Sequence, residues 1–117
     1  MVTVPNVTIC IPTIPTRGAM LTRAVDSVYR QTEQTEIQIE YADQRTGACA
    51  TRNRALDKVT TEFVGFLDDD DELHPRHVEL CLKHLIETGS DVVYPLFTFV
   101  HGDGSESDPR QVFDRSP

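Results

Sequence analysis

The run of five acidic residues from Asp68 to Glu72 contains the side chains of this sequence best suited to bind a cation. Carboxylates about 4 Å apart repel each other by about 1 kcal/mol in water, and by more where they are partly buried. A divalent cation removes this repulsion, and ligands that are all oxygen favour Mg²⁺, Mn²⁺ or Ca²⁺ over zinc or copper. Mg²⁺ uses one or two protein carboxylates and fills its other positions with water and substrate phosphates. The acidic run therefore indicates a site for a metal ion and a diphosphate.

The geometry of this run decides which carboxylates can act together. In an extended segment the side chains alternate, so we expect Asp68 and Asp70 to point to one side and Asp69 and Asp71 to the other. One pair can then face a ligand while the other meets solvent or backbone amides. The alternative is a solvated loop that interacts with the dipole of the following helix. An EF-hand is disfavoured, because the glycine of that pattern is missing.

A basic cluster lies in the segment GACATRNRAL, residues 47–56, with Arg45 just upstream. Gly47 would let backbone amides approach a phosphate, and a helix that begins there would favour the same anion. Arg52 could add bidentate contacts to phosphate oxygens. The alternative is that Arg52 and Arg54 lie on the solvent face of the helix. Arg17, in the turn TIPTRG, is a weaker candidate of the same kind.

The elements that must position these side chains follow from the hydrophobic pattern. Short β-branched or alternating apolar runs predict strands, and apolar residues at steps of three and four predict amphipathic helices. Pro75 suits the first position of the last helix, and Gly89 suits its end. The predicted strands are residues 7–12, 37–41, 63–67 and 92–100, the last broken or edged by Pro95. The predicted helices are residues 19–32, 47–59 and 75–88, and the second is expected to turn Ala48, Ala55, Leu56 and Val59 inward.

Strands that alternate with helices predict an α/β fold, a three-layer Rossmann-like arrangement with a mostly parallel sheet flanked by helices. In open sheets of this kind, ligands bind at the carboxyl ends of the strands. Three loops follow strand ends here, TIPTRG, ADQRTG and DDDDE. We therefore expect these three loops to line one edge of the sheet, where the acidic and basic residues would meet.

Composition limits the classes of partner. The chain has 117 residues and a net charge of −8, which argues against binding to nucleic acid or to anionic membranes. Its apolar stretches are all shorter than the roughly 18 residues needed to span a bilayer, and the N-terminus does not read as a signal peptide. We expect a soluble, cytoplasmic protein.

Four segments occur in an order that resembles one family: IPT, RAVDSVYRQT, TGACATRNRAL and FLDDDDEL. This order is similar to that of the N-terminal, nucleotide-sugar-binding half of family 2 glycosyltransferases, which have the GT-A fold. Each segment alone is a weak signal, but four in sequence are fairly specific and cover residues 7–100. The resemblance implies a nucleotide-sugar-binding domain over residues 1–100, followed by a polar turn and tail over 101–117.

The resemblance also implies roles around the donor diphosphate. Asp68 and Asp70 match the two aspartates of the DXD motif. The counterpart of Asp70 coordinates Mn²⁺ or Mg²⁺, and that of Asp68 lies near the ribose or the metal. Asp71 is a substitute metal ligand, because four consecutive aspartates leave the register of the motif open. Asp69 is a further candidate for binding the nucleotide sugar.

Further roles concern the nucleotide. Pro12 and Thr13 would border the base, and Arg52 matches an arginine near the nucleotide. Asp43 is the one residue of YADQRTG that could replace the aspartate with which the family reads the base. Arg17 completes the candidates for nucleotide-sugar binding, and no catalytic base is assigned.

Taken together, the resemblance implies metal-dependent, inverting transfer of a sugar from a UDP- or GDP-sugar to an acceptor. The alternative is a non-catalytic or incomplete module of the same fold that binds the nucleotide sugar and needs a partner chain, for which a homodimer is one option. A receiver-like or phosphatase-like domain with an aspartate nucleophile is disfavoured, because Lys58 and Lys83 fall in or at the end of predicted helices and not at strand ends.

Overall fold

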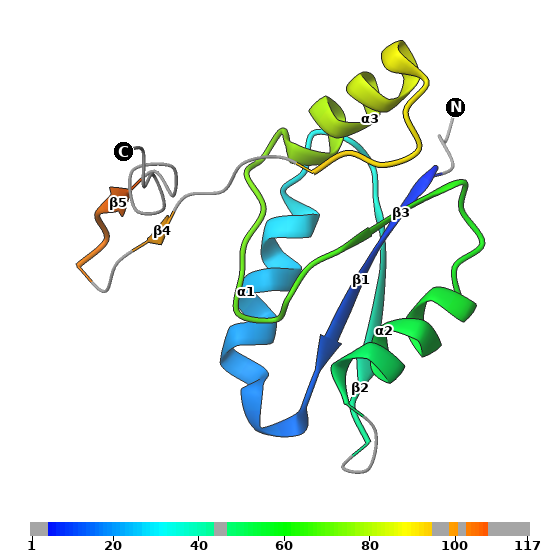
Figure 1. The fold of residues 1–117 in the computed structure, drawn as a ribbon. Helices are drawn as coiled ribbons and strands as arrows, with labels where there is room; N and C mark the ends of the chain where they lie inside the picture. Colours follow the sequence, from blue (N-terminus) through cyan, green and yellow to red (C-terminus); the bar gives the residue numbers. More distant parts are fainter. Residues whose placement is uncertain (1–4, 44–46, 95–98, 101–102, 108–117) are drawn as a thin grey trace, which may run out of the picture. The chain divides into compact units, whose positions relative to one another are not determined.

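A computed structural model describes residues 5–43, 47–94, 99–100 and 103–107 of the chain (Figure 1). Its residues form two compact units, 1–82 and 83–117. The first unit holds the candidate site and the second a short hairpin. None of the described helices is long and apolar enough to cross a membrane.

The first unit is built on a three-stranded parallel sheet. Its strands are β1 (Val7–Thr13), β2 (Glu36–Tyr41) and β3 (Phe63–Phe66), in the order β2-β1-β3. Val7 pairs with Phe63 and Thr8 with Glu36, so β1 is hydrogen-bonded on both edges. The central strand is consequently the most deeply buried, and it reads as an almost continuous apolar run.

Helices cover both faces of this sheet. A short 3₁₀ turn, η1 (Pro15–Arg17), leads into α1 (Gly18–Tyr29), while α2 (Ala48–Asp57) and α3 (His77–Thr88) follow β2 and β3. The apolar core joins one face of β1 to α1 and to the start of α3, through Val7, Ile9, Ile11, Ala24, Val28, Leu67 and Val78. The opposite face of β1 carries fully buried Cys10, and α2 packs against β1 and β2. The parallel sheet flanked by helices confirms the predicted fold class.

The inward face of α2 differs from the prediction. Its buried residues are Thr51 and Ala55, one turn apart, whereas Ala48 and Leu56 are exposed. Thr51, a polar residue, thus lies on the buried face of α2, where the apolar pattern had predicted Leu56. The Thr51 hydroxyl is satisfied inside the helix by the carbonyl of Gly47 at 3.1 Å, which makes its burial tolerable.

Gly65 in β3 lies so close to β1 that a side chain would collide with the core. A Cβ atom at this position would lie 2.7 Å from Cδ1 of Ile9. We expect Gly65→Ala to lower the free energy of unfolding by about 1 kcal/mol, at the lower end for overpacking because the opposing atom is the tip of a side chain. Ile9→Val removes that atom, so the double variant should lose less than the sum of the single losses in urea titrations.

Gly18→Ala is a matched control, since nothing lies within 4 Å of a Cβ there and its φ of −57° is helical. We expect this control to be neutral or stabilising. Additive losses in the Gly65/Ile9 pair would contradict the proposed collision.

The second unit contains the end of α3 and a small hairpin. Gly89 ends α3 with a φ of +68°, as predicted. β4 (Phe99–Val100) pairs antiparallel with β5 (Glu106–Ser107). The prediction of a strand over residues 92–100 is therefore wrong for 92–94, which form no strand, and residues 95–98 lie outside the described part. Val92 and Tyr94 are 77% and 85% exposed, so β propensity there finds no surface to pack against.

Candidate functional site

A cavity of about 350 Å³ lies at the carboxyl ends of the three parallel strands. The three loops predicted to meet there all contribute to it. Its lining is Pro12, Thr13, Ile14, Arg17, Ala42, Gly47, Ala48, Thr51, Arg52, Asp68, Asp69 and Asp70. Of the residues predicted from the sequence, Asp43 is exposed and outside this lining, and Asp71 lies beside it in the acidic segment. The parallel strand order explains why such distant segments converge.

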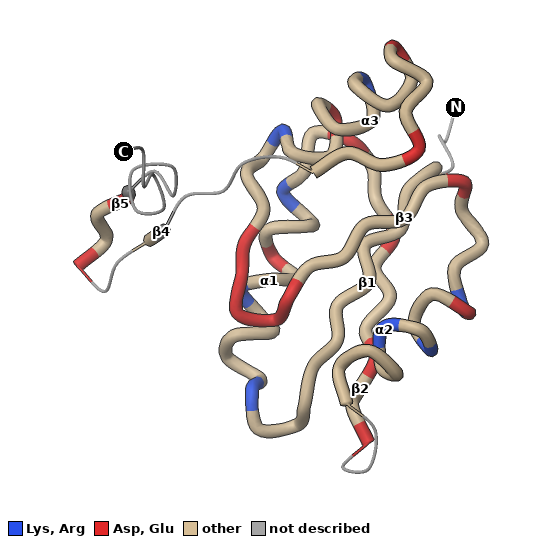
Figure 2. The backbone as a smooth tube through the Cα atoms, viewed as in Figure 1, with Lys and Arg blue, Asp and Glu red and all other residues tan. Residues whose placement is uncertain are grey.

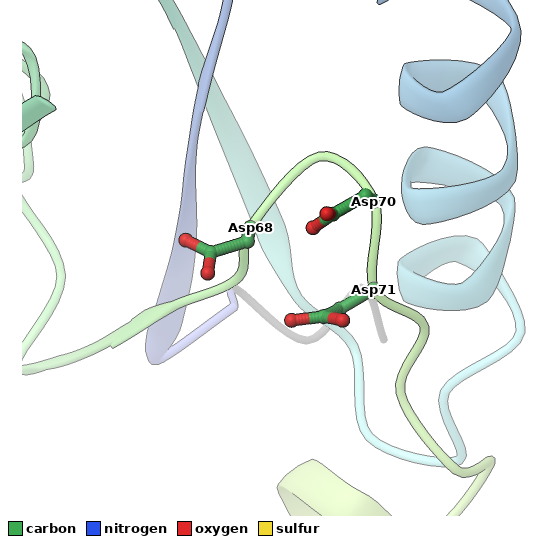
Figure 3. Close-up of side chains that lie close together, drawn as sticks. All are labelled: Asp68, Asp70 and Asp71. Atoms are coloured by element: carbon green, nitrogen blue, oxygen red, sulfur yellow. The ribbon is translucent and has the colours of Figure 1, made fainter. Parts of the chain in front are cut away.

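The acidic segment is a turn and not a continuation of β3. The strand ends at Phe66, and the backbone N–H of Asp71 donates to the carbonyl oxygen of Asp68 at 3.1 Å. The expected alternation is therefore wrong for Asp71, because the first and fourth residues of a turn approach each other. Asp68, Asp70 and Asp71 each offer a carboxylate oxygen within 4.8 Å of the others (Figure 3).

Asp69 points away from this cluster and ties the acidic turn to the end of β1. Its side chain is 4% exposed, accepts a hydrogen bond from the Thr13 hydroxyl at 2.8 Å and pairs with Arg17 at 3.1 Å. Three candidates for nucleotide-sugar binding are thus bonded to one another. A charged, buried carboxylate requires such partners, and two of them suffice here to fix the turn against β1.

Two arginines from different elements reach the cluster from the cavity side. Arg52 of α2 pairs with Asp68 at 2.8 Å, and Arg17 reaches Asp70 at 3.5 Å. Both side chains remain about one-third exposed, at 35% for Arg52 and 38% for Arg17. Figure 2 shows the contrast in charge, with the acidic residues forming a continuous red stretch after β3. The negative charge of the turn is therefore partly offset by side chains that could also meet an anion.

Arg54 takes a different direction from Arg52, although only one residue separates them. It pairs with Glu40 at 3.5 Å and donates to the carbonyl oxygen of Tyr41 at 3.0 Å, along β2. Lys58 joins the same carboxylate at 2.7 Å and is the main reason that the pKa of Glu40 is lowered. The basic segment thus sends Arg52 to the cavity and Arg54 to the sheet edge. Arg45 lies outside the described residues.

The cluster fits a divalent cation by its donor chemistry. Burial, followed by the charges of Asp70, Asp68 and Asp69, raises the pKa of Asp71 above its ordinary value. Burial is the main cause of this shift, and the neighbouring aspartates add to it by repelling the ionised form. Opposite ligands of one Mg²⁺ lie about 4 Å apart, so three oxygens within 4.8 Å need only small adjustments to share an ion. The residues present therefore suit a divalent cation that prefers oxygen ligands.

Replacing Asp71 by asparagine is expected to stabilise the metal-free protein at neutral pH by about 0.5 to 1 kcal/mol, a Coulomb estimate reduced for solvent screening. A carboxyl whose pKa rises on folding binds its proton more tightly when folded, so its ionised form destabilises the fold. The gain should shrink as the pH falls through the raised pKa and should vanish below the ordinary value of 3.8.

Urea titrations at a series of pH values measure this difference. A gain that is equally large at pH 3 and pH 7 would point to a cause other than charge.

The sequence did not predict a role for two residues of α1 and its C-terminal turn, which contact the chain just after the acidic segment. Ser27 and Gln31 make hydrogen bonds to the residues that follow the turn. Both belong to the segment RAVDSVYRQT, which carries part of the family resemblance. That resemblance implied no role for either residue. The available signal was a serine placed among the apolar positions of an amphipathic helix, which marks a buried hydroxyl that needs a partner.

Comparison with known proteins adds to this geometry. The sequence pattern of the family described as "Glycosyl transferase family 2" matches residues 33–116. The protein named "Putative teichuronic acid biosynthesis glycosyltransferase TuaG", of Bacillus subtilis (strain 168), is 26% identical over 87 residues. That alignment covers 74% of this chain and 34% of the relative, so the chain spans about a third of the relative's length. The family match includes both Arg52 and the acidic turn.

Proposed function

This chain belongs to glycosyl transferase family 2, and on that premise we propose that its cavity binds the nucleoside diphosphate part of a UDP- or GDP-sugar for metal-dependent, inverting transfer to an acceptor. The observation that carries the proposal is the meeting of an acidic turn and two arginines at one cavity at the carboxyl ends of the strands. This combination suits a ligand that brings phosphate together with a divalent cation.

The arginines supply the anion-binding side of the proposed site. Arg17 and Arg52 line the cavity with partly exposed side chains, whose guanidinium groups can donate two parallel hydrogen bonds to phosphate oxygens. Asp69, itself held by the Thr13 hydroxyl, pairs with Arg17 from the buried side, so the planar group of Arg17 is positioned before a ligand arrives. Preorganised donors of this kind strengthen binding because little side-chain entropy remains to be lost.

The acidic turn supplies the cation-binding side. We propose that Asp70 and Asp68, with Asp71, hold Mn²⁺ or Mg²⁺ through their clustered oxygens. Bound there, the ion would act as a Lewis acid that offsets the charge developing on the departing nucleoside diphosphate. Asp69 contributes indirectly in this arrangement, by anchoring the turn.

The nucleoside is proposed to lie along the ends of β1 and β2. Pro12 and Thr13 border this part of the cavity, and Ala42, Gly47 and Ala48 add little side-chain volume. Asp43 follows Ala42 directly and is exposed, so we propose that it meets the edge of the base from the rim. The small lining residues leave room for a flat ring, and they support the placement of the base there.

A second function is favoured by the carboxylates of the cavity. Inverting transfer needs a base that deprotonates the acceptor hydroxyl. Among the described residues that line the cavity, the acids are Asp68, Asp69 and Asp70, and each already pairs with an arginine. This favours a module that binds the nucleotide sugar and obtains its base and acceptor site from further residues or from a partner chain, including a second copy.

Calorimetric titration of UDP, GDP and their sugars, each with and without Mn²⁺, tests the proposal. We expect binding of at least one nucleoside diphosphate that strengthens on addition of Mn²⁺. If no nucleotide binds, or if binding ignores the metal, the proposed site is wrong. Metal-dependent binding with release of free sugar or transfer supports the enzyme, whereas such binding without either supports the second function.

A further inference from the structure

α1 and its C-terminal turn hold the segment that follows the acidic turn through two polar side chains. The hydroxyl of Ser27, a residue that is 1% exposed, donates to the carbonyl oxygen of Ala24 at 2.6 Å. The same oxygen accepts the backbone N–H of Leu73 at 3.1 Å. Leu73 packs against the core, so its N–H would otherwise be left without a partner in an apolar surrounding. Ser27 therefore fixes the chain only two residues after Asp71.

Gln31 uses both ends of its amide on the same segment. Its Nε2 donates to the carbonyl oxygens of His74 at 2.7 Å and of Ser27 at 3.0 Å, and its Oε1 accepts the N–H of Val78 at 3.0 Å. The N–H of Val78 lies in the first turn of α3, where backbone donors have no partner inside the helix. Gln31 thus caps α3 from a different element and holds the residues on either side of Pro75.

The acidic turn is consequently anchored at both ends. Near its start, Asp69 is held by Thr13 and Arg17. Just beyond its end, Leu73 is held by Ser27. Within the turn, the described residues show one backbone hydrogen bond, from Asp71 to Asp68. Like-charged neighbours push such a turn open, so its shape depends on the anchors.

We propose that Ser27 and Gln31 are positioning residues, which hold the carboxylates of Asp70 and Asp71 in the cluster by fixing the exit of the acidic turn to α1. The role assigned to the carboxylates rests on the proposed function, whereas the anchoring itself does not. If the two residues served only general stability, their loss would weaken all parts of the unit alike. A positioning role predicts a local effect on the turn.

The experiment compares Ser27→Ala and Gln31→Leu with the wild-type chain by residue-resolved hydrogen exchange. We expect exchange of the Asp71 N–H to accelerate about tenfold, the effect of losing roughly one hydrogen bond. The N–H of Val59, which donates to Leu56 at the end of α2, should change less than about twofold because opening is local. Mn²⁺ affinity, measured by calorimetry on the folded variants, should fall by a similar factor.

Matched variants separate these effects from the loss of any similar side chain. Thr22→Ala removes a hydroxyl that bonds only within α1, to the carbonyl of Gly18, and Gln38→Leu removes a glutamine amide in β2. Neither variant should change the rate at which the Asp71 N–H exchanges with solvent. Gln31→Glu keeps the acceptor for Val78 and loses the donor to His74, so it should give an intermediate rate.

Equal acceleration at Asp71 and Val59 would overturn the positioning role and leave a purely structural one. An unchanged Asp71 in Gln31→Leu would do the same, and this variant decides the matter if Ser27→Ala does not fold. If the wild-type chain binds no Mn²⁺, the proposed function fails, and the exchange at Asp71 still decides whether the two residues position the turn.

Discussion

Replacing Asp70 by alanine is expected to lower the affinity for Mn²⁺ about 100-fold, the equivalent of roughly 3 kcal/mol, and to abolish the metal-dependent part of UDP binding. Asp70 is half exposed and lies in the cluster with Asp68 and Asp71. Its loss removes one of the three clustered carboxylates and with it one charged ligand of the proposed ion. Calorimetric titration of Mn²⁺, with and without UDP, measures both effects.

The metal-free fold should tolerate this change, because the contact of Asp70 with Arg17 is long and exposed, and such pairs contribute about 0 to 1 kcal/mol. Asp26→Ala, at an exposed position of α1, is the matched control and should leave both affinities unchanged. If Asp70→Ala binds Mn²⁺ with the wild-type affinity, either the metal binds elsewhere or the proposed metal site is wrong.

Replacing Arg52 by glutamine should move two affinities in opposite directions. Without nucleotide, Arg52 pairs with Asp68 at 2.8 Å and so competes with a cation for that carboxylate. The pair is partly exposed and contributes about 1 kcal/mol at most, so Mn²⁺ alone should bind a few-fold more tightly in the variant. UDP in the presence of Mn²⁺ should bind about tenfold to 100-fold more weakly, since a charged donor to the diphosphate is lost.

Arg54→Gln provides a control in the same helix. Arg54 contacts Glu40 and the carbonyl of Tyr41, away from the cavity, so neither Mn²⁺ nor UDP affinity should change. The same pair of titrations applies to both variants. A parallel loss of Mn²⁺ and UDP affinity in Arg52→Gln would show that Arg52 supports the acidic turn and does not compete with the cation.

The positions of strands and helices in the first unit followed from local pattern, because β1 is a short, almost continuously buried apolar run and α1 buries residues at steps of three and four. The convergence of three loops followed from parallel connectivity alone. The strand predicted over 92–100 was wrong for 92–94, where Val92 and Tyr94 are exposed, because β propensity reflects packing against neighbours.

Local pattern could not give the conformation of the acidic run. A continuing strand and a tight turn are equally compatible with four aspartates, and tertiary contacts decide between them. Asp69 turns inward because it binds Thr13 and Arg17, which lie more than fifty residues earlier in the chain. Ser27 binds Leu73 over a similar separation. Such pairings join segments that no local periodicity connects.

The central position of β1 in the sheet has a consequence for folding during translation. Val7 pairs with Phe63, so 56 residues separate partners in adjacent strands. At about 5 to 20 residues per second, translation needs roughly 3 to 11 seconds to supply the second partner. Until then one edge of the most apolar strand has no neighbour, and unpaired strand edges of this kind promote aggregation.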